Sequence, residues 1–341
     1  MRQPSALLLL LTLGGYTVGA AAEIEVVTTL PAYASIAQAV GGDRVRVRSI
    51  SRGDEDAHFV KPKPSFALML KSAHLFVTTG LDLEIWAPTL VDKSGNRSIR
   101  DGQPGFVNAS RGVELLDVPA VADRSAGDVH IYGNPHIFTS PLNAKIIAAN
   151  IAAGLRRVDP QAAATYDTNL ARFRRRIDEA LYGSELTELL GAEVLDPLAR
   201  QGKLLDWLAG QELAGEPLAA KLGGWLARST ALRGRQILAY HKNWIYFTDL
   251  FGLEVVGYVE PKPGIPPSAR HVHELVQQVQ QDGIGVLLAA SYFSSRQIGL
   301  IAERTGCRIV QVPLGPAEVS EEGYFELVDD WVEQLAVAAD A

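Results

Sequence analysis

The chain has 341 residues, of which 47% are hydrophobic and 21% are charged. This composition is typical of a folded globular protein with enough chain for two domains, and it excludes a disordered, collagen-like or coiled-coil protein. The net charge is -7, from 32 basic and 39 acidic residues, so the chain lacks the basic surface of a nucleic-acid-binding protein. The only cysteine is Cys307, which excludes a disulfide framework and a zinc site built from cysteines.

The first 22 residues have the pattern of an export signal. Arg2 supplies a positive charge, Ala6 to Leu13 form an apolar segment too short to span a bilayer, and Ala20-Ala21-Ala22 suits a signal peptidase. We therefore expect a signal peptide at 1–22 and a periplasmic protein. Cys307 is far from the cleavage site, so we expect no N-terminal lipid anchor, and no later segment reaches the ~18 apolar residues of a membrane helix.

Predicted strands and helices then alternate along the chain. Such alternation is typical of βαβ units, which build parallel sheets covered by helices on both faces. The first series has strands at 23–30, 44–50 and 74–79 and helices at 31–40 and 64–73. The second series has strands at 236–240, 253–258, 285–290 and 308–312 and helices at 244–251, 269–281, 295–305 and 323–338.

Two further helices, 141–158 and 161–181, are predicted between these series. The second has about 20 residues and would be some 30 Å long, enough to bridge two lobes. The predicted fold class is therefore α/β, with two open parallel-sheet lobes joined by one long helix. We expect an N-terminal lobe at 23–158, a linking helix at 159–183 and a C-terminal lobe at 184–341. The segment 185–234 is mostly helical by pattern, and the sequence assigns it no role.

Three histidines fall where open α/β sheets bind their ligands, in loops beyond the carboxyl ends of strands. His58 follows strand 44–50, His136 precedes helix 141–158, and His241 directly follows strand 236–240. Neutral imidazole is a common ligand of zinc. Taken alone, the three residues leave two interpretations open, a metal site or scattered capping and surface histidines.

The other histidines are weaker candidates. His130 lies six residues before His136 and is an additional ligand, a transient capture site or only a loop residue. His74 opens a predicted strand, where a packed or edge histidine is expected. His271 and His273 are two positions apart on a predicted helix, so they point to different faces and are expected at the surface.

Three loops match a known pattern in the same order along the chain. The sequence around His58 is DEDAHFVKPKPS, followed later by GLDLEIW; the sequence around His136 is NPHIFTSPLNA; and His241 begins HKNWIYF, followed by Gly252-Leu253. The segment PKPGIPPSARHVHELVQQV comes next. Together they resemble the periplasmic zinc- and manganese-binding proteins of cluster A-I (cluster 9) ABC importers. The resemblance covers nearly the whole mature chain and implies a metal in the cleft between two lobes, with slight closure because the linking helix is stiff.

The resemblance implies that His58, His136 and His241 bind the metal. In the family an aspartate after the last strand is commonly the fourth ligand, but the corresponding segment here is Gln311-Val312-Pro313-Leu314-Gly315. Four possibilities remain: Glu260, His130, an acid of Asp54-Glu55-Asp56, or a water molecule. The acidic triplet is otherwise solvated surface or a rim that concentrates cations. Manganese prefers oxygen ligands and higher coordination numbers, so the histidines favour zinc, although the resemblance also allows manganese.

We therefore expect a monomeric protein, not an enzyme, that captures Zn²⁺ with high affinity in the periplasm and delivers it to an inner-membrane ABC permease. One alternative is a periplasmic zinc-dependent hydrolase, which would need a general base and an oxyanion donor such as Glu260 or Tyr292; no common catalytic motif is present. The other alternative is a bilobal binding protein for an organic solute, with Trp86, Trp244 and Tyr292 lining its cleft.

Overall fold

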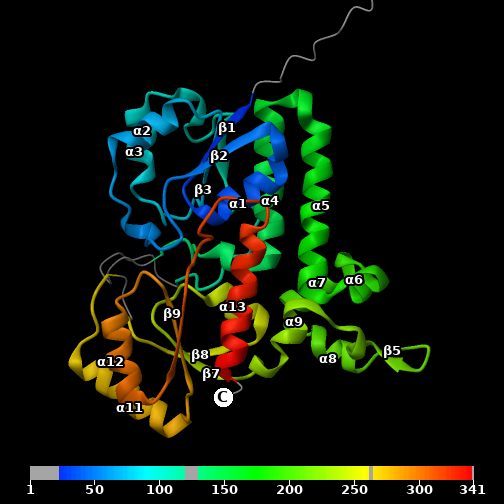
Figure 1. Cartoon of the computed structure of the whole chain (residues 1–341), viewed down its shortest axis with the longest axis vertical. Coiled ribbons are helices and arrows are strands. Elements are labelled where there is room, and N and C mark those ends of the chain that lie inside the picture. Colours follow the sequence, from blue (N-terminus) through cyan, green and yellow to red (C-terminus); the bar gives the residue numbers. More distant parts are fainter. Residues whose placement is uncertain (1–22, 120–129, 261–263, 340–341) are drawn as a thin grey trace, which may run out of the picture.

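The computed structural model describes residues 23–119, 130–260 and 264–339. The predicted signal peptide at 1–22 lies outside these ranges. Figure 1 shows two α/β lobes, one above the other, with a pair of long helices running beside the upper lobe toward the lower one. This arrangement confirms the predicted fold class of two parallel-sheet lobes with a long helix between them.

The N-terminal lobe contains a four-stranded parallel sheet in the order β2-β1-β3-β4. Both α1 and α2 begin at a proline, whose fixed φ suits the first helical turn and whose missing N–H leaves no bond unmade there. Its helix α3 and strand β4 were not predicted, because each is short and amid polar residues. The elements are β1 (Ile24–Thr28), α1 (Pro31–Gly41), β2 (Val45–Ser49), α2 (Pro64–Lys71), β3 (Leu75–Thr78), α3 (Ala87–Ser94) and β4 (Phe106–Asn108).

The C-terminal lobe repeats this design with a parallel sheet in the order β10-β9-β7-β8. Every strand and helix predicted for this lobe is present, with ends that differ by one residue at most. Its elements are β7 (Gln236–Ala239), α10 (Ile245–Phe251), β8 (Glu254–Tyr258), α11 (Ala269–Asp282), β9 (Val286–Ala290), α12 (Ser295–Thr305), β10 (Arg308–Val312) and α13 (Gly323–Ala339).

Two long helices and the final helix hold the lobes together. Helices α4 (Pro141–Val158) and α5 (Ala163–Tyr182) pack side by side, and α5 reaches from the N-terminal lobe to the level of α9 (Figure 1). Helix α13 also packs against α1 of the N-terminal lobe. There the backbone N–H of Tyr324 donates to Ser35 Oγ over 2.8 Å, and its hydroxyl donates to the carbonyl of Phe138 over 2.9 Å.

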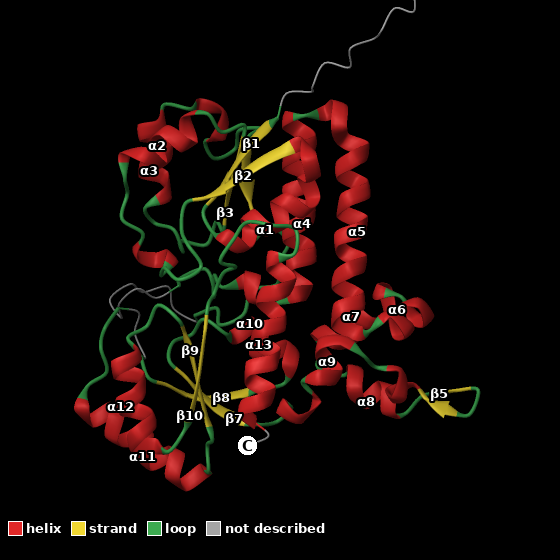
Figure 2. Ribbon diagram, viewed as in Figure 1, coloured by secondary structure: helices red, strands yellow, loops and turns green. Residues whose placement is uncertain are grey.

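The segment after α5 folds into short helices and a small hairpin that projects from the molecule (Figure 2). Its helices pack on α5 and on one another, in agreement with the helical pattern of the sequence. These elements are α6 (Ser184–Leu190), α7 (Ala192–Arg200), α8 (Leu204–Ala209), β5 (Glu212–Leu213), β6 (Glu216–Pro217) and α9 (Gly224–Arg228). In the described ranges, no helix is long and apolar enough to span a bilayer.

One hydrophobic core continues through both lobes. It joins the inner face of the first sheet, represented by Val26 and Leu75, to the inner face of the second sheet, represented by Leu288 and Val310. Separate clusters cover the outer face of each sheet. A shared core of this kind resists large movements of one lobe relative to the other, because such movements would expose apolar surface.

Candidate metal centre

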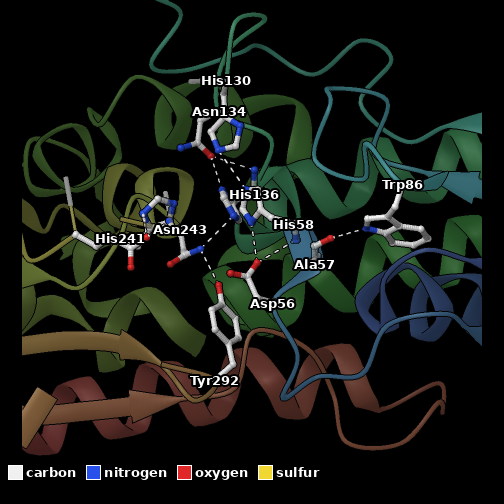
Figure 3. A network of polar contacts seen from close by, with 12 residues as sticks. Asp56, Ala57, His58, Trp86, His130, Asn134, His136, His241, Asn243 and Tyr292 are labelled. Atoms are coloured by element: carbon white, nitrogen blue, oxygen red, sulfur yellow. Dashed lines mark hydrogen bonds and ion pairs between the residues drawn. The ribbon is translucent and has the colours of Figure 1, made fainter. Parts of the chain in front are cut away.

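The three histidines singled out from the sequence lie together between the lobes (Figure 3). His58 is in the short 3-10 helix Ala57–Phe59, His136 immediately precedes another at Ile137–Thr139, and His241 follows β7. The ring centroid of His58 is 5.3 Å from that of His136 and 6.1 Å from that of His241, and the rings of His136 and His241 are 6.3 Å apart. All three side chains are buried.

His130 joins this cluster as a fourth imidazole. Its ring centroid is 5.2 Å from that of His58 and 5.7 Å from that of His136. The Nε2 atoms of His58 and His130 are 3.4 Å apart. Two nitrogens bound to one tetrahedral zinc ion at about 2.0–2.1 Å are separated by about 3.3 Å, so this pair has the spacing of two zinc ligands.

Two residues orient the imidazoles. From the sequence, Asp56 was considered only as one of three acids that could bind the metal, and Asn134 was missed as a site residue. Oδ1 of Asp56 accepts hydrogen bonds from the backbone N–H of His58 over 3.0 Å and from its Nδ1 over 2.8 Å. Oδ1 of Asn134 does the same for His136, over 3.0 Å and 2.9 Å. A proton therefore sits on Nδ1 of each ring, and when the ring is neutral its Nε2 keeps a lone pair. In the sequence, this arrangement is signalled by an Asp or Asn two residues before His58 and His136.

Glu260 lies at the edge of the cluster, after β8. Its Oε1 is 4.0 Å from Nδ1 of His241 and accepts a hydrogen bond from the backbone N–H of Gly264. Among the described residues, Nδ1 of His241 has no hydrogen-bond partner although it is buried. A buried polar nitrogen without a hydrogen-bond partner destabilises the folded protein. A metal ion bound to this nitrogen would remove that penalty.

Burial lowers the pKa of three of these imidazoles, those of His130, His136 and His241, and keeps them neutral. It lowers the pKa of His130 to about 3, assisted by the nearby His58 and His241. Burial and then His58 lower the pKa of His241 to about 4, and burial together with the neighbouring rings lowers that of His136 well below its usual value. Neutral imidazole is the form that binds a metal, so these ligands need not lose a proton at pH 7.

Two residues of the acidic triplet, Asp54 and Asp56, have different surroundings. Asp54 is exposed and pairs with Arg52 over 2.9 Å. Asp56 instead faces inward, where burial raises the pKa of its carboxyl but the hydrogen bonds and charge of His58 outweigh this and leave it lowered. Val312, at the position of the family's aspartate ligand, is buried at the end of β10.

The space beside the histidines is small. A cavity of about 20 Å³ is lined by residues that include His58, His136 and Tyr292. That is room for a single water or ion, whereas pockets for organic ligands measure roughly 300–1,000 Å³. Trp244 packs in the core against Trp331 at 5.2 Å between centroids, and Trp86 is buried with its Nε1 donating to the carbonyl of Ala57. The expected aromatic lining for an organic solute is therefore not formed by these two tryptophans.

In the part of the chain that the structure describes, no three histidine, cysteine or acidic side chains are placed so that they could hold a metal ion together. The imidazoles converge, but Nε2 of His136 is engaged with the amide of Asn243 over 3.1 Å. The remaining histidines lie elsewhere. His271 is half-buried and bonds through Nε2 to the carbonyl of Tyr258, whereas His273 is exposed, as expected for a surface position. His74 is exposed too, and its Nδ1 accepts a hydrogen bond from the backbone N–H of Glu25.

Comparison with known proteins relates the chain to metal transport. The family model "Zinc-uptake complex component A periplasmic" matches residues 26–182 and 219–338. The unmatched segment between them contains α6, α7, α8, β5 and β6. These elements therefore lie outside the matched ranges, whereas the proposed ligands all lie within them.

Curated relatives are named for different metals. The iron-binding protein YfeA of Yersinia pestis is 25% identical over 93% of this chain and 86% of its own length. The high-affinity zinc uptake system protein ZnuA of Paracoccus denitrificans is 23% identical over 83% of this chain and 81% of its own length. The manganese ABC transporter substrate-binding lipoprotein ScaA of Streptococcus gordonii is 26% identical over 47% of this chain and 50% of its own length.

Solved structures share the fold. A crystal structure of a ZnuA deletion mutant with zinc bound matches with a TM-score of 0.69 and 20% identity, over 94% of this chain and 99% of that chain. The substrate-binding protein FpvC of Pseudomonas aeruginosa, in complex with Ni²⁺, matches with a TM-score of 0.66 and 19% identity, over 94% of this chain and 97% of that chain. The family match covers more than half of the chain, and its members are binding components rather than enzymes. The chain therefore belongs to the family of the periplasmic component A of zinc-uptake complexes, the metal-binding, substrate-binding proteins of ABC transporters.

Proposed function

We propose that this protein captures Zn²⁺ in the periplasm and delivers it to an inner-membrane ABC permease. The observation that carries the proposal is the convergence of four imidazoles from both lobes, two of which, those of His58 and His136, line a cavity of about 20 Å³. Imidazole nitrogen suits zinc, whereas manganese and calcium prefer sets rich in oxygen ligands. The zinc uptake named for the Paracoccus relative supports the same choice.

We propose His58, His136 and His241 as ligands and His130 as the fourth. His130 is favoured over Glu260 because its Nε2 already lies at a tetrahedral ligand spacing from that of His58. Oε1 of Glu260, in contrast, is engaged with the backbone of Gly264. Glu260 is then a neighbour whose buried carboxylate stabilises the positive charge of the ion without binding it.

The test of capture is metal analysis of the mature protein, purified without a histidine tag, followed by titration of the stripped protein with Zn²⁺ and Mn²⁺. We expect one tightly bound zinc per chain and weaker manganese binding. His136→Ala should weaken zinc binding strongly, because an ion ligand is lost inside a buried site. His273→Ala, at an exposed position, is the matched control and should bind like the wild type. Wild-type affinity in His136→Ala would refute the site.

The fourth ligand is tested by substituting Co²⁺ for zinc and recording its visible spectrum. His130→Ala should change the intensity and position of the d–d bands, because one nitrogen ligand is replaced by water. Glu260→Gln should leave the bands in place, since that side chain is not a ligand in the proposed set. The opposite result would assign the fourth position to Glu260.

A further inference from the structure

Asn243 sits between one proposed ligand and a tyrosine, and the coordination set does not explain it. Its side chain is fully buried. Nδ2 of Asn243 lies 3.1 Å from Nε2 of His136 and donates to the hydroxyl of Tyr292 over 3.0 Å (Figure 3). Asn243 comes from the loop after β7 in the C-terminal lobe, whereas His136 belongs to the N-terminal part of the chain.

The surrounding hydrogen bonds fix the direction of the contact between Asn243 and His136. Oδ1 of Asn134 accepts from the backbone N–H of His136, and Nδ2 of Asn134 donates to the carbonyl of Lys242 over 2.7 Å. The amide of Asn134 therefore presents oxygen to Nδ1 of His136, which must carry the proton. The Nε2 of the neutral ring is left with only a lone pair, and Asn243 donates an N–H to it.

We propose that Asn243 is a built-in competitor for the metal at His136. Its amide occupies the lone pair that a metal ion needs, so metal binding must first displace this donor. The inference rests on the proposed function, because it takes His136 to be a ligand.

The environment of Asn243 favours displacement. Among the described residues, its buried Oδ1 has no hydrogen-bond partner, so the present orientation leaves one polar atom unsatisfied. A half-turn of the amide would bring Oδ1 toward the hydroxyl of Tyr292, which can donate as well as accept. Metal binding at His136 and reorientation of Asn243 are thus coupled, and Asn243 lowers the affinity and the association rate rather than supplying a ligand.

The test is Asn243→Leu, which keeps the size of the side chain and removes the donor. We expect zinc to bind about two- to tenfold more tightly, the range that corresponds to the net value of one hydrogen bond, and to associate faster in stopped-flow measurements. Affinity is measured by competition with a chelator. The matched control is Asn169→Leu, which removes an amide that donates to the carbonyl of Val40, away from the site, and should leave the affinity unchanged.

Unchanged or weaker zinc binding by folded Asn243→Leu protein would overturn the inference and leave the proposed function standing. Failure of the wild type to bind zinc would overturn both. If Asn243→Leu does not fold, ¹⁵N NMR of histidine-labelled, metal-free wild-type protein decides the question. We expect the Nδ1 of His136 to be protonated and its Nε2 to be unprotonated with the shift of a hydrogen-bond acceptor. A protonated Nε2 would refute the competitor role.

Discussion

At the scale of single residues, this site is a buried group of imidazoles whose tautomers are set by Asp56 and Asn134. Each of these residues accepts two hydrogen bonds from the histidine two positions later. The carboxylate of Asp56 and the amide of Asn134 thus orient their histidines in the same way, since both present an oxygen acceptor. Partners of this kind fix the orientation of a metal-binding histidine and hold its free nitrogen toward the ion.

Replacing Asp56 tests this role. Asp56→Ala should weaken zinc binding by about 10–100-fold, because the ring of His58 loses the acceptor that orients it. Asp56→Asn should retain most of the affinity, since the amide oxygen of Asn134 already serves His136 in this way. Chelator competition measures both. Equal losses in the two variants would show that the negative charge of Asp56, rather than its acceptor geometry, matters.

The lowered pKa values predict how pH affects the metal-free protein. His130 and His241 have folded-state pKa values of about 3 and about 4, below the value of about 6.5 expected for an unfolded chain. Below pH 6.5 the unfolded state therefore binds more protons than the folded state, and stability falls as the pH falls toward about 4. Each such histidine contributes up to about 1.4 kcal/mol per pH unit.

Urea unfolding of the stripped protein at pH 7.5, 6.5 and 5.5 measures this effect. We expect little change in stability between pH 7.5 and 6.5 and a clear loss between pH 6.5 and 5.5. Carboxyl groups with ordinary pKa values stay mostly ionised over this interval, so they contribute little to the loss. The His241→Ala variant should lose less over the same interval. A flat profile down to pH 5.5 would show that these histidines are not buried in neutral form.

At the scale of the helices, a buried ion network joins α4, α5 and α7. Lys145 on α4 pairs with Asp178 on α5 and, over 2.6 Å, with Asp196 on α7. The hydroxyl of Tyr182 donates to Asp196 over 2.9 Å. The side chains of Lys145 and Asp178 are each only 9% exposed, so removing one partner would leave the other charge buried. The network therefore links the long helix α5 to α7 in the segment that follows it.

Substitution of Lys145 should consequently destabilise the fold without touching the site. Lys145→Met is expected to lower the free energy of unfolding by about 3–5 kcal/mol, because Asp178 is left without its counter-ion. Arg175→Met, which breaks an exposed pair with Glu179, should have little effect. Urea denaturation measures both variants. Reduced zinc affinity in folded Lys145→Met protein would contradict the separation of this network from the metal centre.

At the scale of the whole molecule, the lobes meet through a shared core and through a close contact beside the site. The shared core includes residues of both sheets, and α13 packs on α1. Near His58, the backbones of Gly53 and Gly315 approach so closely that a side chain on Gly53 would overlap the carbonyl of Gly315. Both glycines line the small cavity next to the histidines. The spacing of the lobes at the site is therefore set by backbone contact.

Gly53→Ala should push the lobes apart at this point. We expect zinc affinity to fall by about tenfold or more, because ligands from the two lobes must keep their relative positions to within about 0.5 Å. Gly285→Ala is the control, since that glycine has open space around it and no positive φ. Titration of both variants, with circular dichroism to confirm folding, provides the measurement. Unchanged affinity in Gly53→Ala would show that the cleft adapts without cost.

The sequence by itself determined the order of most strands and helices and the loop positions of three histidines, of which His58 and His241 follow strands and His136 precedes α4. These features depend on local periodicity, on prolines that start α1, α2 and α4, and on the rule that open parallel sheets bind ligands at one edge. The three loop motifs also indicated the family, which the family match confirmed.

Only the tertiary structure decided which further groups face the proposed ion. His130 meets His58 across 72 residues of chain, and Asn243 meets His136 across 107 residues. The side-chain pattern within either segment carries no signal for such a meeting, because it depends on how the two lobes pack through their common core. The fourth imidazole, the competing amide and the small cavity thus result from the way the two lobes are arranged. The loop positions of His58, His136 and His241, in contrast, follow from the local pattern of the chain.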